Sequence, residues 1–174
     1  TLVTGPKNSS IIWTENAIAT FNSLKSILSN LVSLKFFNPD LKLQLSTDAS
    51  DVAIGAVLHQ ISDQGPEPLE FFSRKMNTAQ CNYSAFDREL LAIHDSVKHF
   101  RNMLEGRSFT ILTDHKPLLQ LTLLKTPSPR QLRHISFLSE FNFSIAHISG
   151  KNNVVADFLS RPDISSISRL PIFN

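Results

Sequence analysis

The sequence predicts an α/β fold in which one five-stranded mixed sheet is covered by helices. Three successive strand-like runs are joined by short links, a pattern typical of an antiparallel meander. Two later strand-like runs each follow a helical stretch, as parallel-type strands do. A hydrophobic content of 41% and a charged content of 18% suit a globular chain of 174 residues with its own core. These features argue against a doubly wound parallel sheet and a disordered chain.

The chain opens with a predicted helix and the first strand. Thr14 is a good N-cap, and apolar residues at helical spacing follow it to about Asn30. Pro39 then prevents the helix from continuing. Apolar and polar residues alternate from Leu41 to Ser46, so we expect a strand that ends at Asp48.

The middle of the chain completes the meander and adds the longest helix. Residues 52–60 and 69–74 are the second and third predicted strands, separated by the turn signal SDQGPEP. Apolar residues spaced three or four apart predict a helix over 84–104, which Gly106 ends. Residues 107–113 alternate again and predict the fourth strand.

The last third predicts three short helices and one strand. Pro117 suits the first turn of a helix that runs to about Leu124. Residues 129–140 predict a further helix, 141–149 the fifth strand and 152–161 the last helix.

Four acidic residues stand beside apolar, core-like segments of this fold. They are Asp48, Glu89, Asp114 and Asp157. A charge next to a core costs free energy unless it is paired or bound to a metal. Because the first and fourth strands can lie side by side, we expect Asp48 and Asp114 to be neighbours, with Glu89 and Asp157 arriving from two helices. Carboxylate oxygens suit Mg²⁺ or Mn²⁺, so the sequence predicts a site for two such ions, with Asp48 as the bridging ligand.

Each acid also has a structural interpretation when it is taken alone. Asp48 could be a turn residue, Asp114 an N-cap, Glu89 a surface residue, and Asp157 a partner of Arg161 one helical turn away. A Zn²⁺ centre is not indicated, because no cluster of Cys and His has ligand spacing. No compact acidic loop of the Ca²⁺-binding kind is present either.

Charge is distributed unevenly along the sequence. Residues 40–70 carry six acidic residues and one basic residue, whereas residues 98–133 carry seven basic and two acidic residues. An acidic pole for cations beside a basic pole for phosphates favours a nucleic-acid enzyme, and two solvated faces are the alternative. A single cysteine, Cys81, excludes an internal disulfide and suits a reducing compartment. No signal peptide or membrane-spanning run is recognisable, and the start without Met leads us to expect a fragment of a longer chain.

Three segments are long and specific enough to indicate a family: TDASDVAIGAVL, NYSAFDRELLAIHDSVKHFRNMLEGRSFTILTDHKPL and HISGKNNVVADFLSR. They resemble the ribonuclease H domain of gypsy-type LTR retrotransposon polyproteins. The resemblance covers residues 41–162. Residues 1–40 resemble the connecting segment that follows the reverse transcriptase polymerase domain, and 163–174 are expected to be a tail or linker.

The resemblance implies a ribonuclease H-like fold and a two-metal endonuclease that cuts the RNA strand of RNA–DNA hybrids. The family's catalytic acids fall on Asp48, Glu89, Asp114 and Asp157. Asp48 and Asp114 would hold the ions, Glu89 would position a metal near the 2′-hydroxyl, and Asp157 would complete the second ion's shell. The implied partners are the hybrid, gripped through the basic segment, and the polymerase domain of the same polyprotein, with no membrane. The implied location is a cytoplasmic reverse-transcribing particle, with the nucleus as the alternative.

Two histidines lie close to these acids in the sequence. His147 precedes Asp157 by ten positions, where a loop histidine can assist proton transfer or product release in the wider superfamily, although a strand-end histidine is more often structural. His115, beside Asp114, is expected to belong to the start of a helix.

Three rival functions remain open at this point. The chain could be an inactive relic with a structural role, or a nucleic-acid-binding module without catalysis. An integrase-type nuclease would show acids in the order Asp, Asp, Glu, whereas this chain has Asp, Glu, Asp, Asp.

Overall fold

The computed structural model describes residues 14–15, 18–19, 21–22, 34–123 and 126–161. By internal contacts the chain divides into two compact units, residues 1–33 and 34–174. In the first unit the described residues after Thr14 are helical, and the Ile18 N–H donates to the Thr14 carbonyl at 3.0 Å. The predicted end of this helix and the tail after residue 161 lie outside the described residues.

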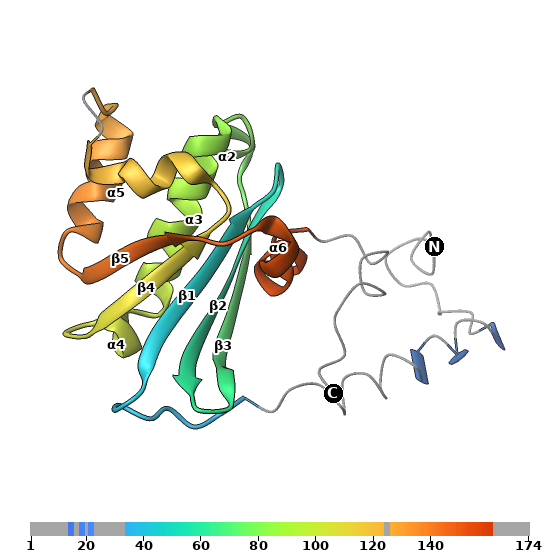
Figure 1. Ribbon diagram of the computed structural model, residues 1–174. Helices are drawn as coiled ribbons and strands as arrows, with labels where there is room; N and C mark the ends of the chain where they lie inside the picture. The colour runs from blue at the N-terminus through green and yellow to red at the C-terminus, as the bar shows by residue number, and fades with distance from the viewer. Residues whose placement is uncertain (1–13, 16–17, 20, 23–33, 124–125, 162–174) are drawn as a thin grey trace. The chain divides into compact units, whose positions relative to one another are not determined.

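The second unit contains one mixed sheet with the strand order β3-β2-β1-β4-β5 (Figure 1). Its strands are β1 (Lys42–Ala49), β2 (Ala53–Ser62), β3 (Gly65–Lys75), β4 (Ser108–Thr113) and β5 (Asn142–His147). The first three pair antiparallel, while β4 runs parallel to β1 and β5 runs parallel to β4. The predicted five-stranded mixed sheet is confirmed.

The turn between β2 and β3 is shorter than the sequence indicates. The strand β3 begins at Gly65 and includes Pro66 and Pro68, which sequence reasoning assigns to the turn. These prolines are tolerated because β3 is an edge strand, where a backbone without an N–H group need not donate to a neighbour. Gly65 has a φ of 114°, a value that favours glycine and lets the chain reverse within two residues.

The described helices of this unit are α2 (Thr78–Cys81), α3 (Ala85–His99), α4 (Arg101–Leu104), α5 (Pro129–Leu138) and α6 (Val154–Ser160), with 3-10 turns η1 (Lys116–Leu123) and η2 (Gly150–Asn152). The predicted long helix is interrupted at Phe100, which is buried and packs edge-on against Phe72 of β3. Sequence reasoning missed α2, which a capping box between Asn77 and Gln80 starts. None of the helices in the described residues is long and apolar enough to cross a membrane.

Helices cover the two faces of the sheet unequally. Figure 1 shows α3 and α5 on one face and α6 on the other. On the α3 side, Leu45, Leu58 and Ile111 of three strands pack with Leu90 and other apolar residues of the helix in the main core. Because strand residues alternate between faces, the neighbouring positions, Gly55 among them, point toward α6.

Helix α6 lies unusually close to the sheet at Gly55. A Cβ atom at this position would lie 2.5 Å from the Ala156 carbonyl oxygen and 2.5 Å from the Ser160 nitrogen. Only a residue without a side chain leaves room for the helix backbone here. Since Gly55 pairs with Asp48 across β1 and β2, this close approach brings the end of α6 beside Asp48.

A histidine in β2 makes the stability of the sheet sensitive to acid. Burial lowers the pKa of His59 from 6.5 to about 4, so the unfolded chain binds more protons than the folded chain between these values. The contribution of neutral His59 to the free energy of unfolding is therefore fully present above pH 6.5 and is lost as the pH falls toward 4. Between pH 7 and pH 5 we expect the free energy of unfolding to fall by about 1–2 kcal/mol more in the parent chain than in His59→Gln, measured by urea titration. Equal losses in the two proteins would contradict this assignment.

Candidate metal centre

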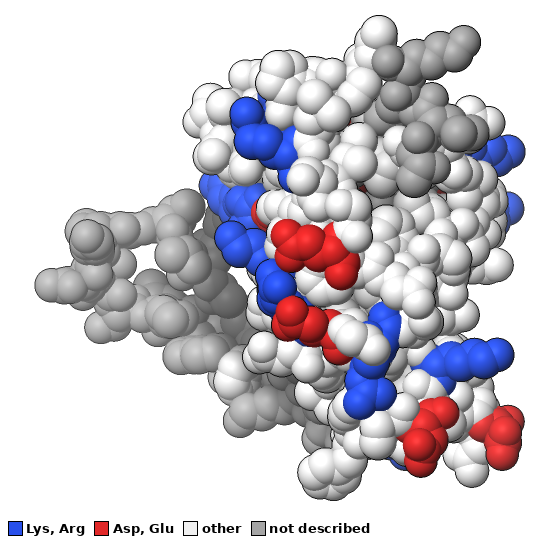
Figure 2. Space-filling model, turned by 90° about the vertical axis from the view of Figure 1, so that its left-hand side faces the viewer, with Lys and Arg blue, Asp and Glu red and all other residues white. Residues whose placement is uncertain are grey.

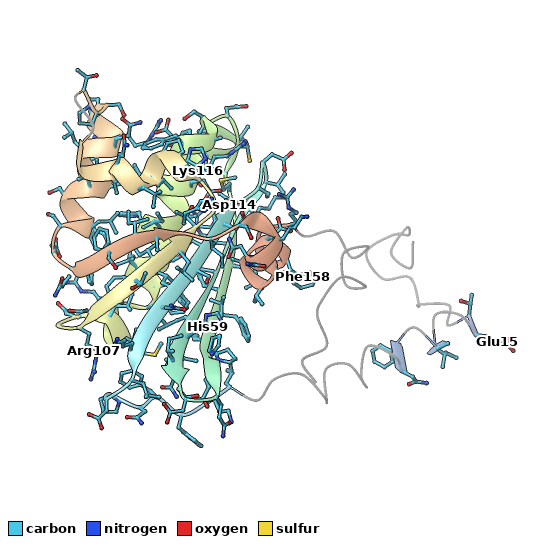
Figure 3. The ribbon with its side chains drawn as sticks, in the orientation of Figure 1. Glu15, His59, Arg107, Asp114, Lys116 and Phe158 are labelled. Atoms are coloured by element: carbon cyan, nitrogen blue, oxygen red, sulfur yellow. The ribbon has the colours of Figure 1, made fainter. Side chains whose placement is uncertain are left out.

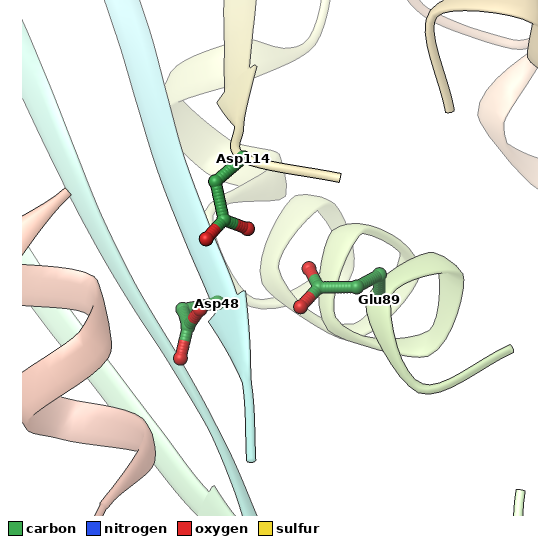
Figure 4. Close-up of side chains that lie close together, drawn as sticks. All are labelled: Asp48, Glu89 and Asp114. Carbon is green, nitrogen blue, oxygen red and sulfur yellow. The ribbon is translucent and has the colours of Figure 1, made fainter. Parts of the chain in front are cut away.

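Three of the four predicted acids meet at one end of the sheet. One carboxylate oxygen from each of Asp48, Glu89 and Asp114 lies within 4.8 Å of the other two, around a common space (Figure 4). Parallel pairing explains why Asp48 and Asp114 are neighbours: Ser46 of β1 pairs with Leu112 of β4, and each acid lies two residues further along its chain. Asp48 and Glu89 are buried, and Asp114, just after β4, is the most exposed of the three.

Glu89 reaches this site from the first turns of α3. The Ser84 hydroxyl accepts a hydrogen bond from the Asp87 N–H and fixes the start of the helix. One oxygen of Glu89, Oε1, accepts a bond from the Ala49 N–H at 3.2 Å. Its other oxygen, Oε2, is buried and has no hydrogen-bond partner among the described residues. A buried carboxylate oxygen without a donor is costly for a protein and is well suited to a cation.

Burial and mutual repulsion disfavour the state in which Asp48, Glu89 and Asp114 are all ionised. Burial raises the pKa of Glu89 to about 8, with added repulsion from Asp48 and Asp114 and a weaker opposing bond from the Ala49 N–H. Burial also raises the pKa of Asp48, although the Ser160 hydroxyl bonded to it acts in the other direction. A divalent cation bound among the three carboxylates would relieve this repulsion. Oxygen-only donors and the unpartnered Glu89 oxygen fit Mg²⁺ or Mn²⁺.

Asp157 is placed differently from the other three. Its side chain lies in α6, is 45% exposed and forms an ion pair with Arg161 one turn further on. It remains close enough to Asp48 to raise the pKa of that carboxyl. The structure therefore brings three predicted acids together and leaves the fourth at the edge of the site, in the helical pair that the sequence allows.

Sequence reasoning missed two residues that shape the site. Ser160 is fully buried and donates its hydroxyl to Asp48 Oδ2. Gly150 lies against Asp114, because a Cβ atom there would be 3.1 Å from Asp114 Oδ2. A signal for Ser160 was available: it follows Asp157 by three residues, so both lie on neighbouring positions of one helix face.

His147 and His115 both lie near Asp114, one on the neighbouring strand and one next to it in sequence. His147 is exposed at the end of β5 and pairs in register with Thr113, the residue before Asp114. His115 precedes η1, and its backbone N–H donates to Thr113 Oγ1 at 3.1 Å. Burial lowers the pKa of His115, and its ring lies 6.0 Å from that of Phe86. A functional role for His147 stays a prediction.

Two arginines of the basic segment, residues 98–133, form ion pairs with acidic side chains. Arg101 pairs with Glu105 and Glu140, and Arg130 pairs with Asp87. Figure 2 shows basic and acidic side chains interleaved on one face.

The remaining cations of this segment lie at different ends of the sheet. Lys116 lies at the same end as Asp114, whereas Arg107 lies toward the opposite end (Figure 3). Lys98 and Arg133 are also exposed. Lys125 lies outside the described residues.

Comparisons with known proteins agree with this fold. Residues 13–111 match the family described as RNase H-like domain found in reverse transcriptase. The chain is 44% identical over 144 residues to the retrovirus-related Pol polyprotein from transposon 297 of Drosophila melanogaster. The matched region covers 83% of this chain and 13% of the polyprotein.

Two solved structures show the same fold at low sequence identity. The foamy viral protease-reverse transcriptase in complex with RNA/DNA hybrid superposes with a TM-score of 0.58 and 15% identity, over 93% of this chain and 22% of that one. LC11-RNase H1 in complex with RNA/DNA hybrid gives a TM-score of 0.53 and 15% identity, over 68% and 93% of the two chains. The sequence matches, which cover most of this chain and a small part of the polyprotein, place it in a family. The chain belongs to the RNase H-like domains found in reverse transcriptases of retrotransposon polyproteins.

Proposed function

We propose that this chain hydrolyses the RNA strand of RNA–DNA hybrids with the help of two Mg²⁺ or Mn²⁺ ions. The observation that carries the proposal is the meeting of Asp48, Glu89 and Asp114, from three separate elements, within 4.8 Å. Two bound ions would supply an activated water and stabilise the leaving oxygen of the phosphodiester. Asp48 would bridge the ions, Asp114 and Glu89 would each hold one, and Asp157 would complete the shell from α6.

The fold gives these side chains a rigid frame. Asp48 and Asp114 come from the ends of two paired strands, and the main chain of β1 itself holds Glu89 through the Ala49 N–H. Such positioning suits a site in which the geometry of attack on a phosphodiester must be held closely. Because each of the three acids lies in or directly beside a packed element, little reorganisation would be needed when substrate and ions bind.

The proposed substrate is an RNA–DNA hybrid rather than either pure duplex. A hybrid has a wide, shallow minor groove with 2′-hydroxyls on one strand only, so a protein can select the RNA strand by shape and hydroxyl contacts. Two structures that share this fold were determined with RNA/DNA hybrid bound, which supports this choice. Exposed cations such as Lys116, at the same end of the sheet as Asp114, would contact backbone phosphates, and binding would weaken with salt.

We further propose that the domain acts during reverse transcription as part of a longer polyprotein. Residues 41–162 would form the catalytic domain, 1–40 the connection from the polymerase domain, and 163–174 a tail or linker. The polymerase domain would supply part of the grip on the hybrid. The proposed location is a cytoplasmic reverse-transcribing particle or the nucleus.

A cleavage assay with three matched duplexes tests this function. The full chain is incubated with end-labelled RNA–DNA, RNA–RNA and DNA–DNA duplexes of one sequence, with Mg²⁺ or with EDTA. We expect Mg²⁺-dependent cleavage of the RNA strand in the RNA–DNA duplex and no cleavage of the other two duplexes. The products should end in a 3′-hydroxyl and a 5′-phosphate. Hybrid binding without cleavage in Mg²⁺ or Mn²⁺ would refute catalysis and favour a binding module.

A further inference from the structure

We propose that Ser160 is a positioning residue whose hydroxyl holds the Asp48 carboxylate in the orientation that binds a divalent cation. This inference rests on the proposed function, because it assigns Asp48 to the metal site. Ser160 is fully buried at the end of α6, and its Oγ donates to Asp48 Oδ2. A hydrogen bond to a charged carboxylate is stronger than one between neutral groups, so it can select one rotamer of the acid.

Three contacts fix the backbone that carries this hydroxyl. The Ser50 hydroxyl donates to the Ser160 carbonyl at 2.7 Å, and Gly55 lets the Ser160 nitrogen approach β2 closely. The Ser73 hydroxyl of β3 donates to the Leu159 carbonyl, also at 2.7 Å. Ser160 therefore belongs to a rigid junction between α6 and the sheet, and its hydroxyl has a fixed direction.

The opposite end of α6 holds the strand beside Asp48. The Asn153 side-chain amide donates to the Thr47 carbonyl at 2.9 Å, next to Asp48 in sequence. Helix α6 thus contacts the backbone before Asp48 through Asn153 and the carboxylate of Asp48 through Ser160. Hydrogen bonds from outer groups commonly orient metal-binding side chains in this way, and losing one lowers metal affinity.

A purely local role for the hydroxyl is the alternative. Serines in helices often bond to a carbonyl of the preceding turn, and Ser160 Oγ does lie 2.9 Å from the Asp157 carbonyl. A hydroxyl has a single hydrogen, however, and the Asp48 carboxylate is the closer and charged acceptor. The predicted consequence is that Ser160 affects metal binding rather than the docking of α6.

Calorimetric titration of the full chain with Mn²⁺ separates the two roles. We compare the parent chain with Ser160→Ala, Asp48→Asn and the matched control Ser73→Ala, which removes another serine hydroxyl from the same helix junction without touching Asp48. Ser160→Ala is expected to weaken Mn²⁺ binding about tenfold, and Ser73→Ala less than about twofold. In the cleavage assay, Ser160→Ala should raise the Mg²⁺ concentration for half-maximal rate while the KM for hybrid is unchanged.

The outcomes distinguish this inference from the proposed function. Equal Mn²⁺ binding by the parent chain and Asp48→Asn would overturn the metal site itself. Binding that depends on Asp48 but is unchanged in Ser160→Ala would overturn the role of Ser160 alone, as would equal weakening in Ser73→Ala. If Ser160→Ala does not fold, Ser160→Cys decides, because its weaker donor should give an intermediate affinity and an unchanged affinity would contradict the inference.

Discussion

Replacing Asp48 with asparagine is expected to slow Mg²⁺-dependent hydrolysis of an RNA–DNA hybrid by at least about a thousandfold. Asp48 is buried between two strands and faces Glu89 and Asp114, so it is the acid best placed to share both ions. Asparagine keeps the shape and an oxygen for the Ser160 hydroxyl, but it offers no negative charge to a cation. The loss should therefore come from metal binding and not from unfolding.

The same substitution is expected to make the fold more stable when EDTA is present. Burial and repulsion from Asp157 and Asp114 raise the pKa of Asp48, so at neutral pH its charge opposes folding. A neutral amide removes that cost, and Asp48→Asn should unfold at a higher temperature than the parent chain. A less active and more stable protein is the expected mark of a functional carboxylate.

Single-turnover cleavage rates and thermal unfolding in EDTA check both effects. Asp51→Asn serves as the control, because this exposed aspartate lies three residues away and outside the group of three acids. It should change the cleavage rate by less than about twofold, as surface substitutions usually do. A retained rate in Asp48→Asn, or an equal loss in Asp51→Asn, would show that Asp48 holds no ion in the reaction.

Replacing Gly55 with alanine is expected to detach α6 from the sheet. The new methyl group would lie 2.5 Å from two backbone atoms of the helix, and backbone cannot rotate away as a side chain can. Overpacking of this kind costs about 3 kcal/mol of folding free energy. Because α6 carries Asp157 and Ser160, hydrolysis of the hybrid should also fall by about a hundredfold, as small misplacements of a site do.

Hydrogen exchange of α6 and urea unfolding measure this change. Gly106→Ala is the control, since Gly106 has a φ of 73° in the turn before β4, and a Cβ atom there would meet nothing within 4 Å in the described chain beyond the two adjoining residues. That variant should lose about 1–2 kcal/mol from backbone strain and keep α6 protected. If Gly55→Ala protects α6 as well as the parent chain does, the close approach at Gly55 does not govern its docking.

Strand pairing was the part of the structure that the sequence predicted best. The order of strands and helices predicted that the first and fourth strands can lie side by side, and the parallel pairing of β1 with β4 brings Asp48 and Asp114 together. Predicted boundaries failed where local signals compete with packing. Pro66 and Pro68 indicate a turn, yet both lie in an edge strand, which tolerates them. Helical spacing of apolar residues continues through Phe100, yet the helix is interrupted at this residue, whose ring is buried in the core.

The sequence by itself determined the order of the four acids and the kinds of element that carry them. It could do so because periodicity and turn residues act over a few neighbouring positions. Only the tertiary structure decided which acids meet and that Ser160 contacts Asp48 from 112 positions away. These relations depend on how closely α6 packs against β2 at Gly55, and such distances arise from the packing of the whole domain rather than from any local pattern.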